Sequence, residues 1–280
     1  MYKKLRWYTI LIISIITTGV LVSGLSISLA LTSSAAKTTN QNLSSVPTPN
    51  SGVVNTTPNS TNPNPNPVKP LINSNNFNIL VLGDSLAKGT GDENSKGFAG
   101  YFADFYKAKT VKPVVLNNLA VNGDVSKGLL KIVETTEART YIKGSNIILV
   151  SIGGNEISRF KTADLSLASD KIKSIQENYT NNIKLILKQI RQTNTACPII
   201  FIGLYNPFGK EITPDKITFV NSWNYNTEQL VSLDSNSLFI PTYDLFKNNL
   251  STYLTADNFH PNSKGYKAIA NRIADAIGND

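Results

Sequence analysis

The 280-residue chain contains a single cysteine, a single histidine and a single methionine. The lone cysteine, Cys197, cannot form a disulfide within the chain, and we expect it to be a small buried side chain ahead of a strand. One histidine and one distant cysteine cannot assemble the His/Cys cluster of a zinc site. Neither a phosphate-binding loop nor a dinucleotide-binding fingerprint is present. The sequence therefore predicts a protein that works without a metal or cofactor.

Acidic residues are absent from the first 76 residues. All 19 lie in residues 77–280, together with 22 of the 27 Lys and Arg residues, so this part carries a net charge of 22 − 19 = +3. The other five basic residues are Lys3, Lys4, Arg6, Lys37 and Lys69. A nearly balanced domain without Lys/Arg runs has no nucleic-acid footprint. The charge distribution therefore argues against nucleic acid as a partner.

The N-terminal segment, residues 1–31, has the composition of an export or anchoring sequence. Three basic residues precede the uncharged, mostly apolar stretch from Trp7 to Leu31. Roughly 25 residues suffice to cross a bilayer core of about 30 Å as a helix, with the basic flank on the cytoplasmic side. We expect a membrane anchor that places the remainder outside the cytoplasm. The alternative is a cleavable signal peptide, because Ser34-Ala35-Ala36 offers the small residues that signal peptidase requires.

Residues 32–76 consist mainly of Asn, Pro, Ser and Thr, with proline at every second position from Asn62 to Pro67. Such a composition predicts a disordered, extended linker that acts as a spacer. The remaining residues, 77–280, are numerous enough for one sizeable core but too few for two full domains. We therefore expect one folded domain after the linker.

Short apolar runs alternate with longer amphipathic stretches throughout residues 77–280. Five runs predict strands: Asn78–Leu82, Val114–Leu116, Ile147–Val150, Ile199–Ile202 and Leu238–Ile240. Near-continuous apolar character is typical of parallel strands that are covered on both faces. Apolar residues at three- and four-residue steps predict helices over residues 172–192 and 263–277. The pattern predicts an α/β fold: a three-layer α/β/α sandwich with a five-stranded parallel sheet and a ligand site at the carboxyl ends of the strands.

The strongest functional signal is a serine at the end of the first predicted strand. Ser85 follows the apolar run directly, in the sequence Gly83-Asp84-Ser85-Leu86. The only histidine, His260, lies near the C-terminus, three residues after Asp257. A serine needs a base to take its proton as it attacks, and an imidazole oriented by a carboxylate is suited to that task. The sequence predicts a serine hydrolase with Ser85 as nucleophile, His260 as base and Asp257 as orienting acid.

Four short motifs, in order along residues 77–280, resemble the blocks of the SGNH, or GDSL, hydrolase superfamily. They are Gly83-Asp84-Ser85-Leu86, Asn122-Gly123-Asp124, Gly153-Gly154-Asn155-Glu156 and Asp257-Asn258-Phe259-His260. The resemblance implies a flavodoxin-like fold and an esterase, lipase or acylhydrolase activity. The third block departs from the usual Gly-Gly-Asn-Asp, because Glu156 stands where the superfamily usually has aspartate.

The resemblance also implies an oxyanion hole with three donors: the backbone N–H groups of Ser85 and Gly123 and the side-chain amide of Asn155. Preorganised donors of this kind usually make the largest single contribution to catalysis of acyl transfer. Taken without the other blocks, Gly123 and Asn155 are equally compatible with ordinary turn residues. Asp84 is expected to support the serine loop by hydrogen bonding rather than to act as a base.

The sequence leaves the substrate open among small-molecule, lipid and glycan esters, since fold does not choose among them. A membrane anchor favours lipid or lysophospholipid esters, and several aromatic residues are candidates for an acyl pocket: Phe98, Tyr101, Phe102, Tyr205, Phe208 and Phe259. Core packing explains Tyr101 and Phe102 equally well. A spacer that reaches toward a cell wall favours a carbohydrate or cell-wall O-acetylesterase instead. An alternative of another class is a catalytically inactive binding module tethered to the surface.

Overall fold

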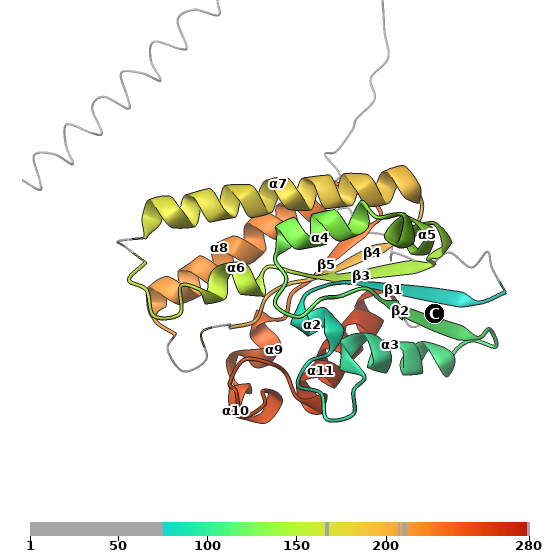
Figure 1. Ribbon diagram of the computed structural model, residues 1–280. Coiled ribbons are helices and arrows are strands. Elements are labelled where there is room, and N and C mark those ends of the chain that lie inside the picture. The colour runs from blue at the N-terminus through green and yellow to red at the C-terminus, as the bar shows by residue number, and fades with distance from the viewer. Residues whose placement is uncertain (1–74, 166–167, 207, 209–211, 279–280) are drawn as a thin grey trace, which may run out of the picture. The chain divides into compact units, whose positions relative to one another are not determined.

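A computed structural model describes residues 75–165, 168–206, 208 and 212–278, all within the compact unit Pro63–Asp280 (Figure 1). The predicted anchor and almost all of the predicted linker lie outside these residues. Among the helices that are described, none is both long enough and apolar enough to cross a bilayer.

The centre of the domain is one sheet of five parallel strands, as the sequence predicts. The strands are β1 (Phe77–Gly83), β2 (Val114–Asn118), β3 (Ile147–Ser151), β4 (Ile199–Ile202) and β5 (Ser237–Ile240). Their order across the sheet is β2-β1-β3-β4-β5, and every neighbouring pair is parallel. This is the flavodoxin-like order, so the predicted fold class is confirmed.

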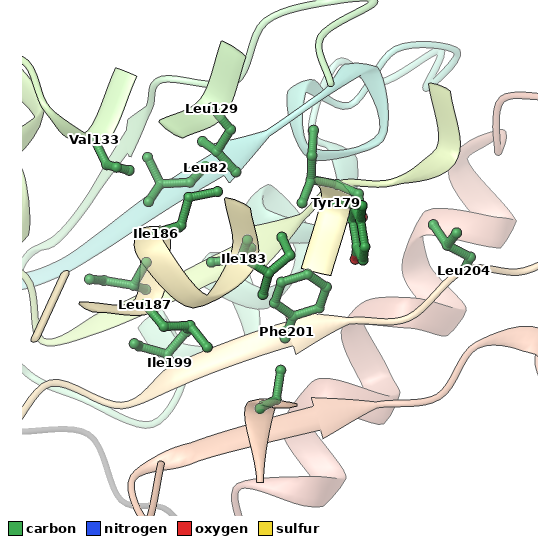
Figure 2. Packing of buried hydrophobic residues seen from close by; sticks show 14 of the residues in the cluster. Leu82, Leu129, Val133, Tyr179, Ile183, Ile186, Leu187, Ile199, Phe201 and Leu204 are labelled. Carbon is green, nitrogen blue, oxygen red and sulfur yellow. The ribbon is translucent and has the colours of Figure 1, made fainter. Parts of the chain in front are cut away.

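The apolar runs of the strands are continuous because both faces of the sheet are covered. In β1, Ile79 and Val81 belong to one buried cluster, whereas Leu80 and Leu82 belong to a second cluster on the opposite face. Successive side chains of a strand point to opposite faces, so each strand contributes to two cores. Figure 2 shows Leu82 in the second cluster beside Ile186.

The helices form one layer on each face of the sheet (Figure 1). The layer over the second cluster contains α4 (Ser126–Val133), α5 (Thr136–Gly144), α7 (Ser169–Thr193) and α8 (Pro214–Val231). The opposite layer contains α3 (Gly97–Lys107) and α11 (Ser263–Ala276). The helices predicted over residues 172–192 and 263–277 correspond to α7 and α11. Their apolar stripes contact the sheet because burial of that face stabilises each helix.

The carboxyl ends of the strands carry the short segments that hold the predicted site. These include α2 (Ser85–Lys88) after β1 and α6 (Gly154–Ser158) after β3, while α9 (Tyr243–Lys247) and α10 (Leu250–Tyr253) follow β5. From β1 the chain crosses to β2 on one side of it, and then to β3 on its other side. Loops diverge at such a reversal of strand order and leave a crevice for a ligand. Ser85 and Asn155 follow the two strands that flank this crevice.

Candidate active site

Ser85 is the first residue of α2 and lies two residues after the end of β1. Gly83, which ends the strand, has φ = 140°, and a Cβ atom there would lie 1.8 Å from the carbonyl oxygen of Ser151. Only glycine permits this close approach of β1 and β3. Asp84 then caps α2, because its Oδ1 accepts a hydrogen bond from the N–H of Leu86 at 3.0 Å. The strand, the glycine and the cap together fix the position of the Ser85 hydroxyl.

The imidazole of His260 lies between Ser85 and Asp257, although 175 residues separate it from the serine. Its Nε2 is 2.9 Å from Ser85 Oγ, and its Nδ1 is 2.7 Å from Asp257 Oδ2. Because an ionised carboxylate only accepts hydrogen bonds, Nδ1 carries the proton and Nε2 is left to accept one from the serine hydroxyl. The three predicted residues thus form one continuous hydrogen-bonded chain.

Asp257 is held in its charged form by several hydrogen bonds. Its Oδ1 accepts from Thr255 Oγ1 at 2.6 Å and from the N–H groups of Phe259 and His260 at 2.8 and 2.9 Å. Partial burial acts in the opposite direction, but these bonds and the imidazole hold the pKa of the carboxyl well below its usual range. Asp257 is therefore an anion at neutral pH. Thr255 was not predicted, because its position two residues before Asp257 is the only sign of its role in the sequence.

The other two predicted oxyanion donors, Gly123 and Asn155, lie in the segments that follow β2 and β3. Asn155 lines the same cleft as Ser85 and His260, and its Nδ2 donates to the carbonyl oxygen of Asp124 at 2.8 Å. That bond leaves the second amide hydrogen of Asn155 available. Gly123 does not line the cleft, but it precedes Asp124 and adopts φ = 77°, which favours glycine. Within the part of the chain that is described, the N–H groups of Ser85 and Gly123 donate no hydrogen bond.

A hydrogen bond also joins the loops that carry the first two motifs. Thr90 Oγ1 donates to Asn122 Oδ1 at 2.8 Å, while the N–H of Thr90 donates to the carbonyl oxygen of Ser85 at 3.0 Å. Thr90 therefore ties the turn before Gly123 to the serine loop. No sequence pattern pointed to this residue.

The cleft beside Ser85 has an apolar wall, but most of the aromatic residues proposed for it lie elsewhere. Tyr205 and Phe259 line it, together with Leu86 and Leu204, which were not predicted. The Tyr205 hydroxyl donates to the carbonyl oxygen of Phe259 at 2.5 Å and so braces the loop before His260. The prediction was wrong for Phe98 and Phe208, which pack in the two cores. Phe102 also lies in a core and Tyr101 packs beside it, as the core-packing alternative predicts.

The described residues contain no group of three or more His, Cys, Asp or Glu side chains that could hold a metal ion. Cys197 is buried and unpaired, as expected, and lies in the core rather than in the cleft. What the site offers is a serine hydroxyl, a base that contacts both this hydroxyl and a carboxylate, and the amide of Asn155 in the same cleft. This combination of groups is suited to acyl transfer.

Asp84 is a buried acid beside Ser85 and has only 3% of its surface exposed. Burial raises its pKa to about 7, the hydrogen bond from Leu86 works in the opposite direction, and the nearby Glu156 raises it further. A carboxyl with a raised pKa binds a proton in the folded domain but not in the unfolded chain. The domain therefore loses stability as pH rises from about 4 to about 7.

Replacing Asp84 with asparagine is expected to flatten this dependence, because a neutral amide oxygen still accepts from Leu86. The interval between 3.8 and about 7 corresponds to about 4 kcal/mol, which is the upper limit of the gain at pH 8. Urea unfolding of both proteins at pH 4 to 8 measures the effect, with Asp275→Asn on the exposed side of α11 as control. Parallel pH profiles for the original protein and Asp84→Asn would contradict the assignment.

Most of the described chain is similar to known proteins, both in sequence and in structure. Residues 79–273 match the family described as GDSL-like Lipase/Acylhydrolase. The uncharacterized protein YpmR of Bacillus subtilis is 31% identical over 207 residues, covering 71% of this chain and 80% of that protein. The spore germination lipase LipC of Bacillus licheniformis is 26% identical over 202 residues, covering 69% and 92%. In structure, the lipase Lip_vut3 from a goat rumen metagenome superimposes with a TM-score of 0.64 at 23% identity, covering 72% of this chain and 97% of the other.

Proposed function

Because this chain belongs to the GDSL-like lipase/acylhydrolase family, we propose that it hydrolyses a carboxylic ester through an acyl-enzyme intermediate on Ser85. The observation that carries the proposal is the hydrogen-bonded chain from Ser85 Oγ through His260 to Asp257, with links of 2.9 and 2.7 Å. The protein is thus a serine ester hydrolase, and each of these three residues has a defined role in the reaction.

In the first half of the reaction, Ser85 Oγ attacks the ester carbonyl carbon while its proton moves to His260 Nε2. Asp257 stabilises the imidazolium that forms, since it accepts from Nδ1 and stays charged. Collapse of the tetrahedral intermediate breaks the bond to the alkoxy oxygen, which leaves as an alcohol with the proton from Nε2. A water molecule then attacks the acyl-serine with the same base, and the acid product leaves with Ser85 restored.

The negative charge that develops on the carbonyl oxygen needs donors on the side opposite the base. The N–H groups of Ser85 and Gly123 and the second amide hydrogen of Asn155 supply them in this proposal. Each such donor is worth about 3 to 4 kcal/mol of transition-state stabilisation. The bond from Asn155 to Asp124 supports this role, because it fixes the amide plane before substrate binds.

The apolar wall supports a lipid or lysophospholipid ester as the substrate. Leu86, Leu204, Tyr205 and Phe259 line the cleft beside the reacting atoms, where an acyl chain would exchange water for apolar contacts. The related spore germination lipase supports the same class of substrate. A membrane anchor in the first 31 residues would hold the domain near its substrate.

A carbohydrate or cell-wall O-acetylesterase is the second candidate, and the size of the cleft favours it. The enclosed part of the cleft beside Ser85 is small, about 20 Å³, which is room for about one water molecule. An acetyl methyl group fits such a space, whereas a long acyl chain would extend beyond it. The two candidates therefore differ in the acyl length that the enzyme prefers.

Hydrolysis of p-nitrophenyl esters from acetate to palmitate, followed by long-chain lysophosphatidylcholine, tests the proposal. For a lipid substrate, we expect kcat/KM to rise at least tenfold from acetate to octanoate, because each buried methylene contributes about 0.8 kcal/mol. A strict preference for acetate would contradict the lipid assignment and favour the O-acetylesterase. A folded protein that hydrolyses none of these esters would favour the inactive binding module.

We also propose an extracytoplasmic location, with the domain held by the N-terminal segment and the linker. The support is the sequence alone: three basic residues, an uncharged apolar stretch and a Pro/Asn-rich spacer. N-terminal sequencing of the mature protein distinguishes the two forms of this proposal. A start at Met1 fits a retained anchor, whereas a start at Lys37 fits secretion after signal cleavage.

A further inference from the structure

Glu156 is a buried acid next to Asn155 that takes no part in the reaction proposed above. It lies on α6 with 5% of its surface exposed. Its Oε1 accepts a hydrogen bond from the backbone N–H of Ser126 at 2.5 Å, and its Oε2 has no partner among the described residues. Burying a carboxyl group with one oxygen left without a hydrogen bond costs free energy of folding.

The contact supplies a cap that α4 otherwise lacks. Val125 occupies the N-cap position of α4 and has no side chain that can accept a hydrogen bond, and the first turn contains no acidic residue. The first N–H groups of a helix need acceptors from outside it. Glu156 provides one from a different loop, so it joins the start of α4 to α6.

Two hydrogen bonds from adjacent residues of α6 reach the same turn. Asn155 Nδ2 donates to the carbonyl oxygen of Asp124, and Glu156 Oε1 accepts from Ser126. This turn begins directly after Gly123, whose N–H is a proposed oxyanion donor. Ser126 Oγ also accepts from Asn182 Nδ2 at 3.0 Å, which ties the turn to the long helix α7. The hydrogen bond that Glu156 accepts is thus one of the contacts that fix Gly123 relative to Asn155.

The length of the side chain is part of the arrangement. Aspartate, which the resemblance leads one to expect at this position, is shorter by one methylene, or about 1.5 Å. At that length the carboxylate could not reach Ser126 without movement of the turn. Glutamine keeps both the length and the acceptor oxygen, so it can replace the contact where aspartate cannot.

We propose that Glu156 is a positioning residue for the oxyanion hole, which it serves by capping α4 from α6 and so fixing Gly123 relative to Asn155. The inference rests on the proposed function, since it assigns a role within the same reaction. It predicts that loss of the contact lowers kcat, because the donors act on the transition state, and leaves KM nearly unchanged.

The test compares Glu156→Ala, Glu156→Asp and Glu156→Gln in the full chain, with p-nitrophenyl butyrate as the substrate. We expect kcat to fall about 10- to 100-fold for alanine and aspartate, which is less than the loss of a donor itself, and less than about threefold for glutamine. KM should stay within about twofold in all three. Thr135→Ala is the matched control, because it removes the side-chain cap of the neighbouring helix α5. It should lower the Tm but not kcat.

A second comparison separates positioning from a general loss of stability. In an Asn155→Ala background, Glu156→Ala should cost less than about threefold in kcat, because the two residues act through the same donors. If the kcat of the double variant falls by the product of the two single losses, the proposal is overturned. An unchanged kcat in folded Glu156→Ala would also overturn it. If that variant does not fold, aspartate performing as well as glutamine would overturn it. The proposed function is tested separately, by Ser85→Ala. If the original protein is active and Ser85→Ala is not, the proposed function stands whatever the Glu156 variants show. If Ser85→Ala keeps the activity, the proposed function is refuted.

Discussion

Replacing Ser85 with alanine is expected to lower kcat for ester hydrolysis by about 10⁴- to 10⁶-fold without unfolding the domain. The variant loses the atom that forms the bond to the acyl group, and no other hydroxyl can take its place, because His260 Nε2 has Ser85 as its partner. The donors of the oxyanion hole remain, so a small rate above that of water should persist. Steady-state kinetics with p-nitrophenyl butyrate and a thermal melt of each protein measure both effects.

The matched control for this variant is Ser232→Ala. Ser232 is an exposed serine that ends α8, where its hydroxyl donates to the carbonyl oxygen of Gln229. This substitution removes the same oxygen atom from a position outside the cleft, so kcat should not change. A p-nitrophenyl phosphonate should phosphonylate Ser85 Oγ with release of p-nitrophenol, and mass spectrometry should find this adduct on Ser85 but not in Ser85→Ala. Substantial turnover by Ser85→Ala would refute the assigned nucleophile.

The fold followed from the sequence because each strand reports its environment directly. An apolar run such as Ile147–Val150 is buried on both faces, and such burial is typical of a parallel sheet between two helical layers. The stripe on α7 was equally clear, since Tyr179, Ile183 and Ile186 lie one turn apart and all contact the sheet side. These patterns involve residues that are close in the sequence, so they can be recognised in a single sequence.

The relationships across the cleft could not be read in the same way. Tyr205 and Phe98 are both aromatic residues near a motif, but Tyr205 lines the cleft and Phe98 is buried against α11. Which face of its helix or loop a side chain occupies depends on contacts with distant elements. The hydrogen bond from the Ser126 N–H to Glu156 spans 30 residues, and because its donor is a backbone group it leaves no mark on the sequence of α4.

A second large effect is expected for Asp257→Asn, which should lower kcat by about 10³- to 10⁴-fold. The amide that replaces Oδ2 can donate to His260 Nδ1, so the imidazole would adopt the tautomer with its proton on Nε2. That proton would then face Ser85 and prevent the imidazole from accepting the serine proton. The variant should also lose stabilisation of the imidazolium, because asparagine carries no charge.

Asp244→Asn is a suitable control, because it removes an ion pair with Arg272 outside the cleft and should leave kcat unchanged. The pH dependence gives a further test of the geometry. Hydrogen bonds hold the pKa of the Asp257 carboxyl well below its usual range, so its protonation should not contribute to the acid limb of the original enzyme's kcat profile. If Asp257→Asn instead kept full activity at neutral pH, Asp257 would be a capping residue of the Thr255 to His260 loop. The imidazole would then need no carboxylate to orient it.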